Sequence, residues 1–291
     1  MDRKDFLKTI SLLMAGPMVS SAQPLLDELK KADFTPRMPV LFIGHGNPMN
    51  ALYDNAFTKK LHSLKNSITS PKTILVISAH WLTRGTYVST NPSPKTIYDF
   101  GGFPDELFKV KYEPKGNPEL AKEIQTKINY STIGEDTTMG LDHGAWTILK
   151  HIYPKADIPT FQLSIDYSKP ASYHYELAKQ LNYLRDKGVL IIGSGNIVHN
   201  LGMVDFNNPT NAYDWAIEFD TTVKTYLDKG DDVSLINYEK LGKSALLSIP
   251  TNDHYLPMIY ILGLKNKGEH VSYLYESMEY GSLSMRSFII N

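Results

Sequence analysis

The sequence contains no cysteine among its 291 residues. A disulfide, a thiolate metal site, an iron–sulfur cluster and a cysteine nucleophile are therefore excluded. Any bound metal must be held by histidine and carboxylate side chains, which is typical of zinc, non-haem iron, copper or nickel sites. The chain also has no long run of one charge, since its 30 basic and 31 acidic residues are spread along it. This balance predicts no nucleic-acid partner and no anionic membrane surface.

Internal repeats, low-complexity tracts and linker-like stretches are also absent from the sequence. A hydrophobic share of 42% is sufficient for a sizeable core. We therefore expect one domain over residues 34–291, preceded by an N-terminal segment of residues 1–33.

The N-terminal segment begins with basic residues, continues with an apolar run from Ile10 to Val19 and ends with Ser20-Ser21-Ala22. This order is typical of a signal peptide, and it resembles a degenerate twin-arginine signal with Lys4 in the place of the second arginine. The apolar run is too short to span a bilayer. The alternative is an amphipathic helix from Leu7 to Met14. We expect a periplasmic protein if the segment is a signal peptide and a cytoplasmic protein otherwise.

Three apolar runs each end in small or polar residues and are followed by a histidine. Val40–Ile43 leads to His45, Thr73–Ile77 leads to His80, and Val189–Ile192 leads to His199. Uninterrupted apolar runs of this length are typical of strands buried on both faces of a sheet. In open α/β sheets, ligands bind beyond the carboxyl ends of the strands, so the sequence predicts a site where these histidines meet.

Amphipathic segments alternate with these strands. The spacing of their apolar residues predicts helices over Asp54–Lys65, Pro118–Ile128, Gly144–Tyr153, Tyr173–Lys187 and Tyr213–Asp228. Further strands are expected over Pro159–Ile165, Val271–Tyr275 and Ser284–Ile290. The alternation predicts an α/β fold, a single domain whose central, mostly parallel or mixed β-sheet is flanked by helices.

The nine histidines differ in their surroundings. Four lie in helical or turn contexts typical of ordinary surface or packing residues: His62, His151, His174 and His270. His45 lies between two glycines, which allow close backbone approach, although a turn histidine that caps a helix has the same surroundings. His143 and His254 each follow an aspartate at a predicted helix start, where the aspartate could simply be the N-cap.

Two further stretches contain closely spaced glycines. Tyr98–Pro104 is aromatic and glycine-rich, so it either walls a pocket or forms a turn-rich connection. Gly193-Ser194-Gly195-Asn196 lacks the spacing of a dinucleotide fingerprint and of a Gly-x-Ser-x-Gly nucleophile elbow. No Walker-type phosphate loop occurs in the sequence.

Five short motifs are more specific in combination than any one of them is alone. Over about residues 38–290 they are Gly44–Met49, Ser78–Trp81, Leu141–Trp146, Gly193–Asn200 and Asp253–Pro257. Together, and in this order, they resemble the class III extradiol ring-cleavage dioxygenases, in particular the DOPA 4,5-dioxygenase-like branch. The resemblance implies an enzyme that inserts both atoms of O2 into a DOPA-like or other small catechol. A small aromatic diol and O2 are therefore the expected partners.

The resemblance also implies roles for individual residues. One divalent metal ion is expected, with His45, His80 and His254 as its ligands. His199 matches the acid/base residue of the family, and His143 matches a second histidine that contacts substrate or oxygen. Fe(II) is expected for activity because the metal must pass electron density between the ring and O2. Redox-inert Zn(II) is expected as the occupant of a purified or substrate-free form.

The chain departs from the family pattern at two positions. Asn47 stands where serine is common, and His254 stands where the protocatechuate-cleaving branch has glutamate. A neutral set of three histidines leaves iron and zinc both open. Two alternatives therefore remain on the same scaffold: a zinc-dependent hydrolase with His199 as the base, and a non-catalytic zinc-binding protein with His199 as a fourth ligand.

Overall fold

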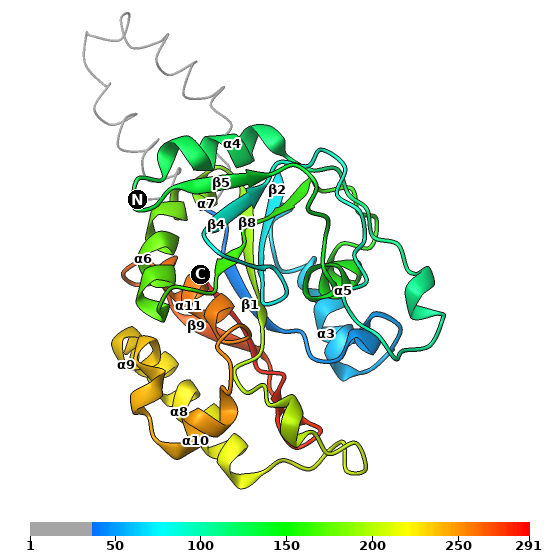
Figure 1. Ribbon diagram of the computed structural model, residues 1–291, viewed down its shortest axis with the longest axis vertical. Coiled ribbons are helices and arrows are strands. Elements are labelled where there is room, and N and C mark those ends of the chain that lie inside the picture. Colours follow the sequence, from blue (N-terminus) through cyan, green and yellow to red (C-terminus); the bar gives the residue numbers. More distant parts are fainter. Residues whose placement is uncertain (1–36) are drawn as a thin grey trace, which may run out of the picture. The chain divides into compact units, whose positions relative to one another are not determined.

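The computed structural model describes residues 37–291 (Figure 1), and residues 1–36 lie outside the described part of the chain. The signal peptide predicted within residues 1–33 falls outside the described part, so its cleavage and the localisation of the protein stay predictions. Among the helices of residues 37–291, none is long and apolar enough to cross a bilayer.

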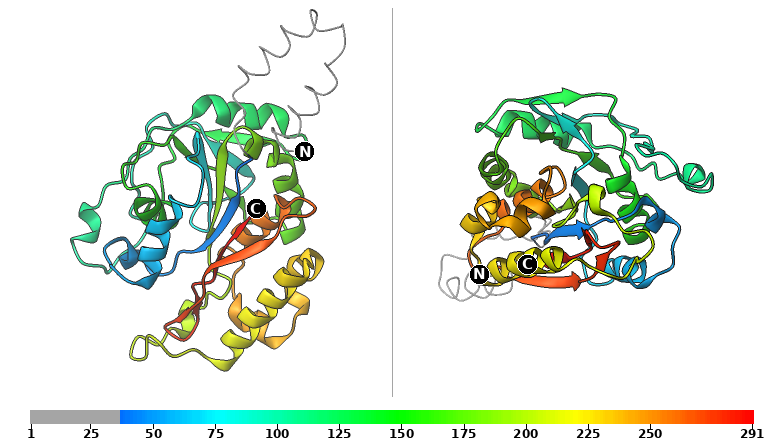
Figure 2. Two further views of the ribbon diagram at one scale, coloured as in Figure 1. Left: turned by 180° about the vertical axis from the view of Figure 1, so that it is seen from behind. Right: turned by 60° about the horizontal axis from the view of Figure 1, so that its bottom comes forward.

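A mixed sheet of six strands forms the centre of the described chain. Its strands, in spatial order, are β6 (Thr160–Gln162), β2 (Thr73–Ser78), β8 (Val189–Gly195), β1 (Val40–Gly44), β12 (Ser287–Ile290) and β9 (Val271–Tyr275). The first four strands run parallel to one another. The other two are antiparallel and form one edge, as Figure 2 shows.

Helices cover both faces of this sheet, which confirms the expected α/β fold with a mixed central sheet. On one face lie α3 (Ala56–Leu64) and α5 (His143–Ile152), and on the other lie α6 (Ala171–Leu181) and α11 (Leu256–Gly263) (Figure 1). Further α-helices are α4 (Pro118–Lys127), α7 (Tyr183–Asp186), α8 (Asp214–Lys229), α9 (Asp232–Ile236) and α10 (Lys243–Ser248).

Short elements connect the larger ones. The 3₁₀ helices are η1 (Pro48–Ala51), η2 (Leu107–Lys109), η3 (Leu201–Met203) and η4 (Tyr238–Lys240). Two-stranded sheets are formed by β3 (Leu82–Thr83) with β7 (Ile165–Asp166), by β4 (Thr86–Ser89) with β5 (Ile133–Asp136), and by β10 (Met278–Glu279) with β11 (Leu283–Ser284).

The central strands are buried because their side chains alternate between two apolar layers. In β1, Val40 and Phe42 join the cluster that contains residues of α6 and α11, while Leu41 and Ile43 join the cluster that contains residues of α3 and α5. Each such side chain stabilises the fold by about 1.5–3 kcal/mol when it is fully buried. Neither face is left for polar residues, which explains the uninterrupted apolar runs in the sequence.

Two predicted elements are divided in the structure. The strand predicted over Pro159–Ile165 splits into β6 and β7, because the backbone N–H groups of Ser164 and Ile165 donate to Tyr87 and Trp81 instead of continuing along β2. The helix predicted over Tyr173–Lys187 splits into α6 and α7. There the N–H of Asn182 bonds to the carbonyl three residues earlier, which ends the α-helical ladder.

His174 gives the fold a calculable pH dependence. It is fully buried in α6, and its Nδ1 lies 3.1 Å from the Tyr260 hydroxyl. Burial lowers the pKa of His174 to about 4, whereas a histidine in the unfolded chain has a pKa of about 6.5. The unfolded state therefore binds more protons in this window, so the stability contributed by neutral His174 is lost as pH falls from 6.5 toward 4.

The free energy of unfolding should decrease less between pH 6.5 and pH 4 in His174→Gln than in the wild type, by up to roughly 3 kcal/mol. Urea unfolding of metal-free protein at several pH values measures the effect. The matched control is His62→Gln at an exposed position, which should keep the wild-type slope. An unchanged slope in His174→Gln would contradict the assignment of a neutral buried ring.

Candidate active site

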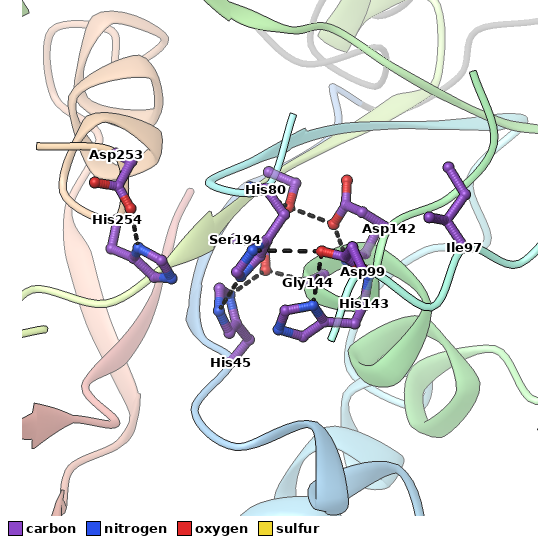
Figure 3. Close-up of polar contacts among 12 residues, drawn as sticks. His45, His80, Ile97, Asp99, Asp142, His143, Gly144, Ser194, Asp253 and His254 are labelled. Atoms are coloured by element: carbon purple, nitrogen blue, oxygen red, sulfur yellow. Dashed lines mark hydrogen bonds and ion pairs between the residues drawn. The ribbon is translucent and has the colours of Figure 1, made fainter. Parts of the chain in front are cut away.

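Three of the predicted site histidines come together beyond the carboxyl ends of the parallel strands (Figure 3). His45 follows the last residue of β1, and His80 lies two residues after the end of β2. His254 lies in the loop that leads into α11. One side-chain nitrogen from each of the three lies within 4.8 Å of the others. The strand-end arrangement predicted from the sequence is therefore present for His45 and His80.

The rings of these three histidines lie close together and are uncharged. Burial, reinforced by the neighbouring histidines, lowers the pKa of His45, His80 and His254 well below the usual value, so the rings are neutral near pH 7. The Nε2 atoms of His45 and His80 lie 3.1 Å apart. The buried Nε2 of His254 has no hydrogen-bond partner among the described residues.

This arrangement fits a single divalent metal ion. Two imidazole nitrogens that are each about 2.1 Å from one ion, at a right angle, lie about 3 Å apart. The spacing of 3.1 Å between His45 and His80 meets that requirement. Neutral imidazole is the form of histidine that binds metals, so the chemistry of the donor set agrees with its geometry.

Hydrogen bonds at Nδ1 leave Nε2 free in two of these histidines. The Ser194 hydroxyl lies 2.6 Å from the Gly144 carbonyl and donates to it, so the same oxygen accepts from Nδ1–H of His45 at 2.9 Å. Nδ1 of His254 lies 2.5 Å from the Asp253 carboxylate. Partners of this kind fix the tautomer and the ring orientation of metal-binding histidines.

Two glycines allow the loops to approach this closely. A side chain on Gly195 would place its Cβ 2.1 Å from the carbonyl oxygen of His254. Gly46 has a φ of +62°, and a Cβ there would lie 2.4 Å from the sulfur of Met285. The loop geometry on both sides of the site therefore requires glycine.

His143 and Asp99 form one side of the site. Asp142 caps α5 by accepting from the Ala145 N–H, which confirms the N-cap expected from the sequence. His143 is the first residue of that helix and is buried. The Asp99 carboxylate accepts from both the backbone N–H and Nδ1–H of His143, each at 2.9 Å. The rings of His143 and His80 are 3.8 Å apart between centroids.

His199 lies four residues after the end of β8, and this strand extends three residues beyond the apolar run Val189–Ile192. The strand stops at Gly195 because the next N–H, from Asn196, donates to the His254 carbonyl. The His199 ring stacks on the His254 ring at 3.4 Å with an interplanar angle of 6°. Burial lowers the pKa of His199 to about 4, although the nearby Asp253 carboxylate opposes the shift.

A cavity of about 530 Å³ opens beside these residues. The five site histidines line it, as do four apolar or aromatic side chains from two loops: Phe100, Phe103, Leu201 and Phe206. The stretch Tyr98–Pro104 therefore contributes a pocket wall, which was one of its two interpretations. The histidines expected to be ordinary, His62, His151, His174 and His270, do not line this cavity.

Three polar residues of the site had no functional prediction from the sequence. They are Asp99, Ser194 and Asp253, which hydrogen-bond to His143, His45 and His254. Asp253 directly precedes its partner, and Asp99 is the only charged residue of the aromatic loop. These two positions in the sequence could have indicated that Asp253 and Asp99 belong to the site. Ser194 gives no such signal, because its partner lies 149 residues away in the chain.

Comparison with known proteins identifies the family. Residues 34–286 match the family model described as the catalytic LigB subunit of aromatic ring-opening dioxygenase. The chain belongs to this family, and it is an enzyme of the extradiol aromatic ring-opening dioxygenase class.

Individual relatives agree with this assignment. The chain is 44% identical over 255 residues to a 4,5-DOPA dioxygenase extradiol of Escherichia coli K12, and the alignment covers 86% of this chain and 94% of the relative. It is 38% identical over 257 residues to a 4,5-DOPA dioxygenase extradiol of Beta vulgaris, covering 85% and 94%. A crystal structure of an uncharacterized Escherichia coli K12 protein, 40% identical, superimposes with a TM-score of 0.77 and covers 88% of this chain and 100% of that one.

The hydrogen bonds of Ser194 predict a measurable effect on stability. Ser194→Ala removes a partner from both the His45 ring and the Gly144 carbonyl. We expect the free energy of unfolding to fall by about 1–3 kcal/mol for each buried group left unpaired. Ser248 supplies a matched control, because it is also fully buried but its hydroxyl has no partner in the described chain.

Ser248→Ala should therefore be close to neutral. Urea unfolding of both metal-free variants makes the comparison. Equal losses of stability in Ser194→Ala and Ser248→Ala would show that the Ser194 bonds do not hold the site together.

Proposed function

We propose that this protein inserts both atoms of O2 into the ring of a small catechol, DOPA or a close analogue, at one divalent metal ion bound by His45, His80 and His254. The observation that carries the proposal is the convergence of three neutral imidazoles at the wall of a cavity of about 530 Å³. Membership of the ring-opening family and the names of the relatives support the same reaction.

Fe(II) is the metal that we propose for the active enzyme, because a redox-active ion bound there would be able to pass electron density between the aromatic ring and O2. The three histidines are equally suited to Zn(II), which is redox-inert and would occupy the site without supporting ring opening. Ser194 and Asp253 would hold two of the proposed ligands, His45 and His254, in place by hydrogen bonds at Nδ1.

His199 is the proposed acid/base residue. Its ring nitrogens form no hydrogen bond within residues 37–291, whereas Nδ1 of His45, His143 and His254 is already bonded. With its pKa lowered to about 4 by burial, the ring is neutral near pH 7 and is able to accept a proton from a substrate hydroxyl. Stacking on His254 holds it beside the metal ligands.

The cavity walls suit a flat aromatic substrate. Phe100 and Phe103 line it from one loop, and Leu201 and Phe206 line it from another with 66% and 74% of their surfaces exposed. A catechol ring placed against these side chains would remove apolar surface from water, at about 25 cal/mol per Å². The DOPA-like identity of the substrate is supported by the names of the relatives.

The reaction is tested with protein reconstituted anaerobically with Fe(II), DOPA and ¹⁸O2. We expect O2 uptake and a ring-opened product that contains both labelled atoms. A zinc-dependent hydrolase or a closed zinc site would consume no O2. His199→Ala should keep the metal and the catechol-induced absorbance but lose turnover by ~10²- to 10⁴-fold.

Metal analysis completes this experiment. His80→Ala should lose most of its metal, because one of three proposed ligands is removed, while His62→Ala at an exposed position should keep it. If His199→Ala also loses metal, His199 is a fourth ligand and not the acid/base residue. Normal turnover in His199→Ala with full iron occupancy would exclude both roles.

A further inference from the structure

Asp99 uses both of its carboxylate oxygens on one residue. Oδ1 accepts from the backbone N–H of His143 and Oδ2 accepts from its Nδ1–H, each at 2.9 Å (Figure 3). The aspartate comes from the aromatic loop, and the histidine comes from the first turn of α5. This pair of bonds therefore ties a cavity-lining loop to the site and fixes the His143 ring in two places.

These bonds define which nitrogen of His143 faces the substrate. A carboxylate only accepts hydrogen bonds, so Nδ1 must carry the proton. In the neutral ring, Nε2 then has a lone pair and no proton. Because His143 lines the cavity and its Nδ1 is occupied by Asp99, Nε2 is the nitrogen left for a ligand.

We propose that Asp99 is a positioning residue that holds His143 as the Nδ1–H tautomer, so that Nε2 accepts a hydrogen bond from a hydroxyl group of the substrate. The inference rests on the proposed function and adds to it a specific contact between His143 and the substrate. The sequence left open whether His143 contacts substrate or oxygen. A lone pair at Nε2 favours the catechol hydroxyl, which has a proton to donate, over O2, which has none.

Two other roles for Asp99 are less consistent with the geometry. Asp99, His80 and His143 form a compact group of possible metal ligands, but both Asp99 oxygens already accept bonds from His143. The Asp99 carboxylate also lies 3.5 Å from Nδ1 of His80, which is longer than either bond to His143. Action through His143 is therefore the stronger assignment.

Asp99→Asn tests the assignment with little change in shape. The amide has one accepting atom and one donating group, so it cannot accept from both N–H groups of His143. We expect ¹⁵N NMR of the zinc-loaded protein to show that His143 loses its Nδ1–H tautomer. In the iron-loaded protein, kcat should fall by about 10- to 100-fold with metal content unchanged.

The matched control is Asp231→Asn. Asp231 also uses both carboxylate oxygens on one residue, since Oδ1 accepts from the backbone N–H of Ser234 and Oδ2 accepts from its hydroxyl, but it does not line the cavity. This variant should keep wild-type tautomers and wild-type kcat. A comparable fall in kcat in Asp231→Asn would mean that the loss in Asp99→Asn comes from general loop damage and would overturn the assignment.

A double variant shows whether Asp99 acts through His143. In a His143→Ala background, adding Asp99→Asn should cause no further loss of kcat, because the two residues form one unit. A full additional loss, or a loss of metal like that of His80→Ala, would overturn the proposal. Failure of the proposed function is seen separately, as a wild-type protein that consumes no O2 with catechol while the tautomer change in Asp99→Asn is still observed.

Discussion

The site depends on one electrostatic constraint, which is that several imidazoles must stay neutral while buried together. Charged rings at these distances would repel one another and would lose their hydration, and burial indeed lowers the pKa of His45 and His254. Neutral rings remain ambiguous in their tautomer. Ser194 and Asp253 remove the ambiguity by binding Nδ1, so that the Nε2 atoms turn inward.

The sheet provides the positions for this arrangement. Strands β2, β8 and β1 are parallel neighbours, so their carboxyl ends open at one edge, where the loops bearing His80, His199 and His45 begin. The glycine at position 195 lets the chain after β8 contact the loop of His254. Backbone contacts therefore bring together histidines from distant parts of the sequence.

Much of this was predictable from the sequence, and the remainder had a physical reason to be missed. The apolar runs of β1, β2 and β8 predict buried parallel strands. The histidines that follow these runs predict a site at the carboxyl ends of the strands. The pairing of Asp99 with His143 is not visible in the sequence, because it depends on how the aromatic loop folds back across 44 residues. The division of Pro159–Ile165 into two strands was also hidden, since it follows from competition between two sets of backbone acceptors.

The central claim is that three neutral histidines hold the metal, and X-ray absorption spectroscopy of the iron-loaded protein tests it most directly. The multiple-scattering pattern of imidazole reports how many rings bind the ion. We expect three imidazoles together with oxygen ligands from water. A first shell with fewer than three imidazoles, or one with a fourth imidazole and no open position, would contradict the proposed arrangement of His45, His80 and His254 with His199 left free.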